Sequence, residues 1–167
     1  GREKNGDRYP FIRHLLSDPT LKPGKDEILL SVAHMKEVLA IRNSSPLFRL
    51  RTAADVRRRV RFYNTGPEQK PGVIVMGITD DDADGVGLCV DPNFIRVMVC
   101  VNVTGEAVVV NNDPNLARDL AGAKLKLHPL QGSIAPDAAY LSLAAFSQAG
   151  GAVTVPPHST VVFVEER

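Results

Sequence analysis

Short segments of strand-forming residues dominate the chain from residue 60 onward, and turn residues separate each segment from the next. In the clearest segment, 95–103, Ile or Val occupies every second position, which is the side-chain period of a strand. Gly and Pro pairs such as Pro71-Gly72 and Pro156-Pro157 mark turns between segments. Many short strands with such turns are typical of an antiparallel β-sandwich. The sequence predicts strands over 60–62, 73–79, 95–103, 107–110, 123–127, 140–146, 152–155 and 160–165.

One longer helix is predicted ahead of these strands, over residues 26–42. Asp26 and Glu27 lie in its first turn, where carboxylates complement the helix dipole, and Pro46 prevents its continuation. Apolar residues at helical spacing form what we call the helix stripe: Ile28, Val32, Met35 and Leu39. No other long helix is predicted, so the stripe should lie on the sandwich edge or against a partner that this chain does not supply.

Shorter helical segments are predicted on both sides of that helix. Thr52 and Asp55 have the spacing of a capping box, which predicts a short helix over 52–58. Residues 1–25 contain three prolines and are expected to be irregular, with about one turn of helix around residues 11–16.

Composition excludes several classes of partner. The chain has 167 residues and a net charge of +1, so its overall charge does not favour nucleic acid or an acidic membrane surface. It contains no apolar run of the roughly 20 residues that a membrane-spanning helix needs. Its first residues are polar, without the apolar core of a signal peptide and without Met. Cys89 and Cys100 are predicted to be one loop thiol and one buried thiol.

Three stretches of the chain resemble the C-terminal region of one enzyme family. They are "IRNSSPLFRLRTAADVRRRVRFYNTGPEQKPGVIVMGI" (41–78), "TVPPHSTVVFVEER" (154–167) and, more loosely, "YPFIRHLLSDPTLKP" (9–23). The resemblance is to pullulanase-type starch debranching enzymes, including limit dextrinases, of glycoside hydrolase family 13. In that family a (β/α)8 barrel hydrolyses α-1,6-glucosidic branch linkages, and a β-sandwich follows it.

The resemblance implies a division of the chain. Residues 1–46 resemble the C-terminal end of the catalytic barrel, with 26–42 as its last helix, and residues 47–167 resemble the sandwich. The expected partner is therefore the barrel of the same enzyme, and an α-glucan would be met only through that parent enzyme. A plastid location is implied if the protein is of plant type, and an extracellular one if it is bacterial.

No catalytic residue is assigned in this chain. A retaining glycosidase needs two carboxyl groups about 5–5.5 Å apart, and the resemblance places them on barrel strands that no segment here resembles. The carboxylates before the strands are expected to be solvated on helix starts or exposed faces: Asp26, Glu27, Glu37 and Asp55. His14, His34, His128 and His158 are scattered, and neither a nucleophile elbow nor a phosphate-binding glycine loop is present. The chain alone is therefore expected to be non-catalytic.

One acidic stretch, "DDDADGVGLCVD" (80–91), has calcium-loop spacing. Asp80, Asp82, Asp84 and Asp91 occupy positions one, three, five and twelve, and Gly85 is at position six. However, the twelfth residue is Asp rather than the longer Glu, and strands rather than helices flank the loop. A solvated acidic hairpin loop is the interpretation we favour, and a calcium site is the alternative.

Nucleic-acid binding is the first of three other functions, and it is not expected here. Six arginines between residues 49 and 61 would suit nucleic acid, but Phe48 and Phe62 are expected in the core rather than as stacking platforms. A stand-alone glucan-binding or calcium-binding module is the second alternative, although only Tyr9, Tyr63 and Tyr140 could present a ring beside the phenylalanines. A domain that binds another protein through the helix stripe is the third.

Overall fold

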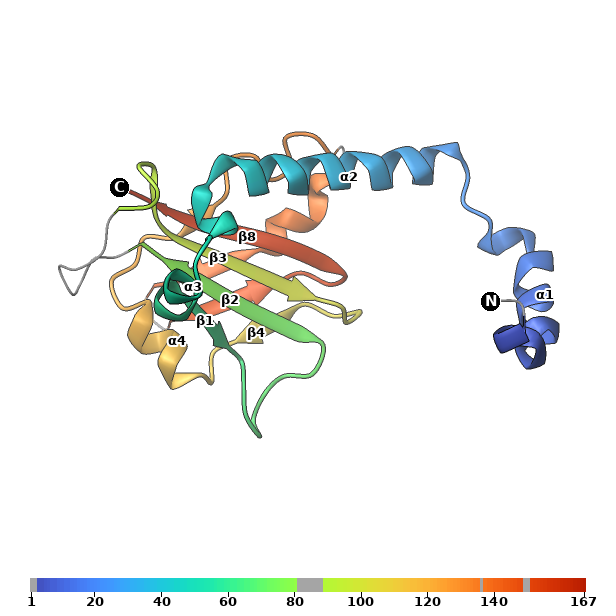
Figure 1. The fold of residues 1–167 in the computed structure, drawn as a ribbon, viewed down its shortest axis with the longest axis horizontal. Coiled ribbons are helices and arrows are strands. Elements are labelled where there is room, and N and C mark those ends of the chain that lie inside the picture. Colours follow the sequence, from blue (N-terminus) through green and yellow to red (C-terminus); the bar gives the residue numbers. More distant parts are fainter. Residues whose placement is uncertain (1–2, 81–88, 136, 149–150) are drawn as a thin grey trace.

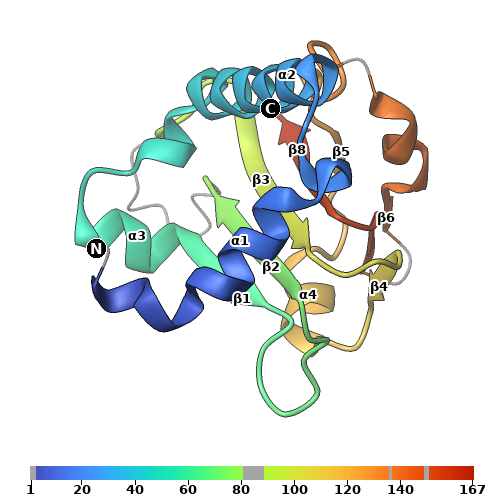
Figure 2. The same ribbon diagram turned by 90° about the vertical axis from the view of Figure 1, so that its right-hand side faces the viewer.

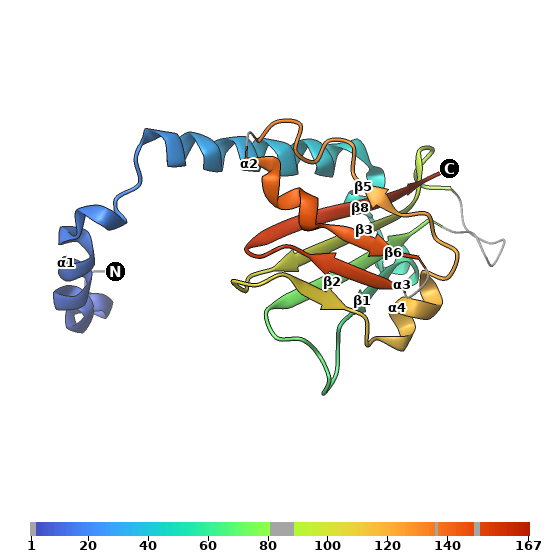
Figure 3. The same cartoon turned by 180° about the vertical axis from the view of Figure 1, so that it is seen from behind.

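The computed structural model describes residues 3–80, 89–135, 137–148 and 151–167. Its strands form two antiparallel sheets, one in the order β1-β2-β3-β8-β5 and the other in the order β4-β7-β6 (Figures 1 and 3). The expected antiparallel strands are thus confirmed. Their bounds are β1 Val60–Tyr63, β2 Val73–Thr79, β3 Phe94–Asn102, β4 Val108–Val110, β5 Lys126–Leu127, β6 Ala145–Ser147, β7 Ala152–Val155 and β8 Ser159–Glu166.

The two sheets pack on each other through a shared apolar core. The five-stranded sheet contributes Val75, Met98 and Cys100, and the smaller sheet contributes Val110 and Val153. Because side chains alternate along a strand, the valines of β3 point to the opposite, outer face of the larger sheet. The central strands therefore carry apolar residues on both faces. Cys100 is buried and Cys89 is exposed, as predicted.

A second core lies on that outer face. Val97 and Val164 of the sheet pack there with Ile41 of helix α2 (Lys25–Ser44) and Leu47 of the 3-10 helix η3 (Pro46–Arg49). Only the C-terminal part of α2 takes part. Its N-terminal part extends beyond the sheets as a rod (Figure 1), and Figure 2 views the molecule from the N-terminal end of this rod.

The chain before α2 lies away from the sheets at the far end of the rod (Figure 1). It is more helical than predicted, because it forms η1 (Glu3–Arg8), α1 (Tyr9–Ser17) and η2 (Pro19–Leu21). No residue of these three elements is buried. The helices of this N-terminal segment are therefore held by local contacts, and within the described residues no packing against the sheets stabilises them.

Two predicted strands are confirmed only at their ends, and one helix was not predicted. The segment 140–146 is mainly a 3-10 helix, η4 (Ala138–Leu143), because Tyr140, Leu141 and Ala144 reach the core at helical spacing. Only the last two residues of 123–127 pair with β8. Helix α4 (Pro114–Asp119) was not predicted, although Asp113 caps it and Pro114 begins it, which is a recognisable start signal. The short helix after Thr52 is confirmed as α3 (Ala53–Arg59), capped by the Thr52 hydroxyl.

Candidate interaction surface

Helix α2 is attached to the domain by a set of polar contacts that we call the helix anchor. Near the middle of α2 the Glu37 carboxylate accepts hydrogen bonds from the backbone N–H groups of Ile134 (3.0 Å) and Ala135 (3.1 Å). One turn earlier, His34 Nε2 lies 2.7 Å from the Asp137 carboxylate. Both contacts join α2 to the chain segment before η4.

Glu37 was expected to be solvated, and that prediction was wrong, because the side chain is only 2% exposed. Burial by itself would raise the pKa of Glu37. The backbone N–H groups of Gly132, Ile134 and Ala135 outweigh it and hold the pKa below its usual range. The carboxylate is therefore charged at neutral pH and anchors α2 to this segment.

The C-terminal end of α2 has two further anchoring contacts. Ser44 Oγ lies 2.9 Å from His128 Nε2 and donates to the Ile41 carbonyl oxygen at 2.7 Å. The next residue, Ser45, donates its hydroxyl to the Asp91 carboxylate and accepts from the Leu47 N–H. The end of α2 and the start of η3 are therefore fixed to two different loops of the domain.

The pH dependence of stability tests the contact at His128. His128 Nδ1 accepts from the Leu130 N–H (3.1 Å), so the neutral ring carries its proton on Nε2, and burial lowers the pKa of this ring. Below a pH of about 6.5 the unfolded chain takes up a proton that the folded ring resists. We expect urea titrations to show full stability above that pH, and a progressive loss as pH falls from there toward the lower folded-state pKa.

The matched variant is His128→Asn, whose Oδ1 can accept from the Leu130 N–H but which cannot titrate. Its unfolding free energy should change less between pH 7 and pH 5 than that of the unchanged protein, because the amide takes up no proton in either state. An unchanged slope would show that other groups cause the pH dependence.

The helix stripe faces away from the anchor. Its four residues are between 43% and 61% exposed, although they are large and apolar. Leu29 and Val38 beside it are about half exposed as well. The apolar residues of α1 continue this pattern, since Phe11 and Leu16 are exposed. An apolar surface of this extent marks an interaction site rather than an ordinary protein surface.

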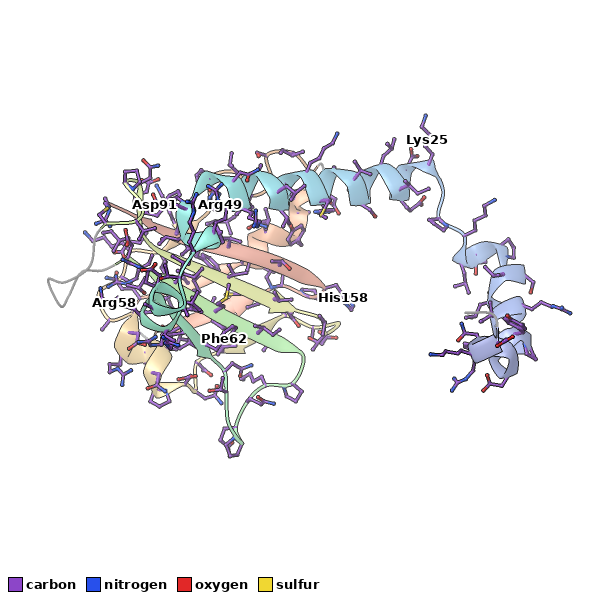
Figure 4. The ribbon with its side chains drawn as sticks, in the orientation of Figure 1. Lys25, Arg49, Arg58, Phe62, Asp91 and His158 are labelled. Atoms are coloured by element: carbon purple, nitrogen blue, oxygen red, sulfur yellow. The ribbon has the colours of Figure 1, made fainter. Side chains whose placement is uncertain are left out.

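The outer face of the large sheet adds a second apolar area next to α2. Phe62, Met76 and Val99 lie side by side on neighbouring strands. Phe62 was expected in the core, but it is 58% exposed, because β1 is the edge strand and this position points outward (Figure 4). A cavity of about 230 Å³ lies between this area and α2, lined by Val38, Ile41, Arg42, Phe48, Met76, Val99, Gln131, Thr160 and Val162.

The structure places the other candidate residues as follows. Asp26, Glu27 and His14 are exposed on helices, and Asp55 is half-buried beside Thr52. His128 and Glu37 are buried in structural contacts that the local sequence does not signal. Over the part of the chain that the structure describes, no three His, Cys, Asp or Glu side chains could hold a metal ion together.

The ends of the proposed calcium loop are engaged in structural contacts. The Asp80 carboxylate bonds Arg59 and Arg167 and accepts from the Asp91 N–H. The Asp91 carboxylate accepts from Asn93 N–H and Phe94 N–H. Asp82 and Asp84 lie outside the described residues, so the solvated hairpin loop stays the prediction and a calcium site stays the alternative.

The tyrosines and arginines are placed as follows. Tyr63 is buried, and its hydroxyl donates to Asp119 at 3.2 Å, with burial as the main cause that raises its pKa to about 12. Tyr9 is exposed and Tyr140 is half-buried. Arg59 is buried, whereas Arg49, Arg51, Arg57, Arg58 and Arg61 are exposed. The absence of a nucleic-acid partner stays a prediction.

No helix among the described residues has both the length and the hydropathy to cross a membrane.

The fold and this surface define a β-rich domain that carries an anchored helix with an unpartnered apolar side. Comparison with known proteins is consistent with this class: the model for the C-terminal part of pullulanase-type alpha-1,6-glucosidases matches residues 1–166. The chain belongs to this family, as the resemblance in its sequence indicates.

Individual relatives agree with this assignment. The chain is 38% identical to the chloroplastic Pullulanase 1 of Arabidopsis thaliana over 98% of its length, and 30% identical to a pullulanase of Klebsiella pneumoniae over 95%. It spans only 16% and 13% of these two proteins. A crystal structure of a maltotriose complex of PulA from Klebsiella pneumoniae matches with a TM-score of 0.72 at 32% identity, over 87% of this chain and 14% of that one.

Proposed function

We propose that this chain is the non-catalytic C-terminal part of a pullulanase-type α-1,6-glucosidase, and that it supports the catalytic barrel of that enzyme. The observation that carries the proposal is the exposed helix stripe on a helix that is firmly anchored at its other side. In a barrel helix, such a stripe would be buried by neighbouring helices. The small share of each relative that the chain spans supports the same proposal.

The division of the chain follows from this proposal. Residues 1–46 would complete the barrel, with α2 as its last helix, and residues 47–167 would form a β-sandwich that covers its flank. The anchor then has a defined role, because it fixes the orientation of α2 relative to the sheets. Starch-like α-glucans would be hydrolysed by the parent enzyme only.

The cellular location that we propose depends on whether the protein is of plant or bacterial type. The relative from Arabidopsis is described as chloroplastic, and another relative is bacterial. We therefore propose a plastid location if the protein is of plant type and an extracellular one if it is bacterial.

Hydrolysis of pullulan and a stripe variant together test the proposal. The purified chain should release no reducing sugar from pullulan, and the double variant Val32→Gln, Met35→Gln should unfold within about 0.5 kcal/mol of the unchanged chain, because both side chains are exposed. When the chain is joined to the C-terminal end of a pullulanase barrel, the same double variant should lower the melting temperature and the pullulan-hydrolysing activity of the joined protein. The reason is that apolar surface of the barrel would then face the polar amides of the two glutamines.

The control is Lys36→Gln, an exposed residue of α2 that is not part of the stripe. This control should change neither the unfolding of the chain alone nor the melting temperature and activity of the chain joined to a barrel. Turnover of pullulan by the repurified chain, or equal behaviour of the stripe variant and the control behind the barrel, would refute the proposal.

A further inference from the structure

The outer face of the five-stranded sheet is apolar beyond the part that α2 and η3 cover. Ile74 and Met76 point to this face, because they alternate along β2 with Val73 and Val75, which belong to the core between the sheets. Ile74 is 55% exposed, and Phe62 on the edge strand is 58% exposed. An antiparallel strand with one solvated face alternates apolar and polar residues, whereas a continuous apolar run is typical of a strand covered on both faces. We therefore expect the open half of this face to be covered by a partner.

The cavity between α2 and the sheet lies where the covered and the open halves of this face meet. Its lining includes Val38 and Ile41 of α2, Phe48 of η3, and Met76 and Val99 of the sheet. An apolar cavity of about 150 Å³ can hold a benzene ring. This cavity has a volume of about 230 Å³, so it has room for one large apolar side chain of a partner.

The cavity is continuous with the helix stripe. Val38 lines the cavity and lies three residues after Met35 of the stripe, so the two side chains are neighbours on the surface of α2. Figure 1 shows α2 running along the sheet, with β2 and β3 in open view beside it. A partner that covers the stripe is therefore brought next to the cavity and the sheet face.

The elements that border this face are basic. Arg42 lines the cavity, and Asp55 is the one acidic residue between positions 38 and 63, where its carboxylate accepts from the Thr52 hydroxyl. The net charge of the whole chain is only +1, so the positive charge is concentrated here. Protein interfaces combine an apolar centre with complementary charges at the rim, so the partner is expected to carry carboxylates. The other exposed arginines between these positions are Arg49, Arg51, Arg57, Arg58 and Arg61.

We propose that this face binds one acidic amphipathic helix of the catalytic barrel, with a large apolar side chain of that helix in the cavity and its carboxylates beside the arginines. The proposal rests on the proposed function, in which α2 completes the barrel. Helices form the outer ring of such a barrel, so a helix is the element that lies next to α2. The chain spans 16% of its Arabidopsis relative and matches the C-terminal part of the family, so the remainder of such a protein would supply this helix. A contact through the stripe alone would leave Phe62 and Ile74 exposed, and the sheet therefore adds a second contact.

Hydroxyl-radical oxidation of side chains, read by mass spectrometry, tests this contact. It compares the 167-residue chain alone with the chain joined to the C-terminal end of a pullulanase barrel. The three methionines report on three places: Met35 on the stripe, Met76 at the cavity and Met98 in the core between the sheets. In the joined protein we expect oxidation of Phe62 and Met76 to slow at least about threefold, because oxidation follows exposure. Met98 is the internal control and should stay unreactive in both proteins.

The methionines also separate this proposal from the supporting role of the chain. Slower oxidation at Met35 with unchanged oxidation at Phe62 and Met76 would overturn the sheet contact and leave the role of the stripe intact. Unchanged oxidation at all three positions would contradict both proposals.

Reversal of one charge tests the acidic character of the partner helix. Arg42→Glu should lower the melting temperature of the joined protein by at least about 2 °C more than that of the chain alone, because it brings like charges together. The matched control is Lys36→Glu, at an exposed position of the same helix outside the stripe, and it should change both melting temperatures equally. An equal effect of Arg42→Glu in the two proteins would mean that no carboxylate faces Arg42, and the proposal would be wrong.

Discussion

Replacing Asp80 with Asn is expected to lower the free energy of unfolding by about 3–5 kcal/mol, the usual cost of removing one partner from a buried ion pair. The Asp80 side chain is fully buried at the end of β2. It bonds the buried Arg59 at the end of α3 and, at 2.6 Å, the guanidinium of Arg167. The variant would leave the Arg59 charge without its buried carboxylate, since an amide cannot supply a negative charge.

The same carboxylate joins several parts of the chain. It accepts from the backbone N–H groups of Val90 (3.0 Å) and Asp91 (2.9 Å), so α3, β2, the segment before β3 and the C-terminal residue meet at one side chain. Burial would raise the pKa of Asp80, but the N–H groups and the two arginines outweigh it and lower the pKa. The stabilisation is therefore present above a pH of about 4 and is lost as pH falls toward the lower folded-state pKa.

Urea titration at pH 7 measures this prediction. Asp55→Asn is the matched control, because Asp55 faces the same arginine at 3.9 Å but is half-exposed, and should cost no more than about 1 kcal/mol. Equal effects of the two variants would show that burial of Asp80 does not decide its contribution. If the variant instead changes how steeply the free energy of unfolding falls with urea concentration, the compactness of the folded or the unfolded state has changed.

Local sequence patterns predicted most strands and the main helix correctly. Ile or Val occupies every second position over 95–103, which is the period of a strand, and β3 forms there. Apolar residues in α2 follow helical spacing up to Pro46, so both the type and the end of this helix could be read from the sequence. The segment that became η4 shows the limit of this approach. Its apolar residues fit either period over a short length, and contact with the core of the folded domain decides between them.

The exposed apolar surface was predictable, whereas the anchor was not. The helix stripe follows from spacing within one helix, together with the absence of a second long helix in the sequence. Glu37 looks like an ordinary surface residue of α2, because its partners at 134 and 135 are almost a hundred residues away in the sequence. Asp80 and Arg167 meet in the same way. Only the tertiary fold brings such groups together, and no local pattern signals them.

Leu47 lies where α2, η3 and the large sheet meet. It is only 1% exposed and packs in the outer core with Ile41 of α2, Val97 of β3 and Val164 of β8. Leu47 follows Pro46, which fixes the first turn of η3, and its own N–H donates to the Ser45 hydroxyl. The side chain therefore links the anchored end of the helix to the sheet.

Leu47→Ala should lower the free energy of unfolding by about 2–5 kcal/mol, because it removes buried methyl groups and leaves a cavity that a fixed turn cannot close. Urea titration gives the magnitude. Hydrogen exchange should also show faster exchange in the last turns of α2 than in β7, which does not contact this core. Leu143→Ala, at a side chain that is half-exposed in η4, is the control and should cost about 0.5 kcal/mol or less. Uniform acceleration of exchange across both elements would mean that Leu47 supports the whole domain rather than the position of α2 on it.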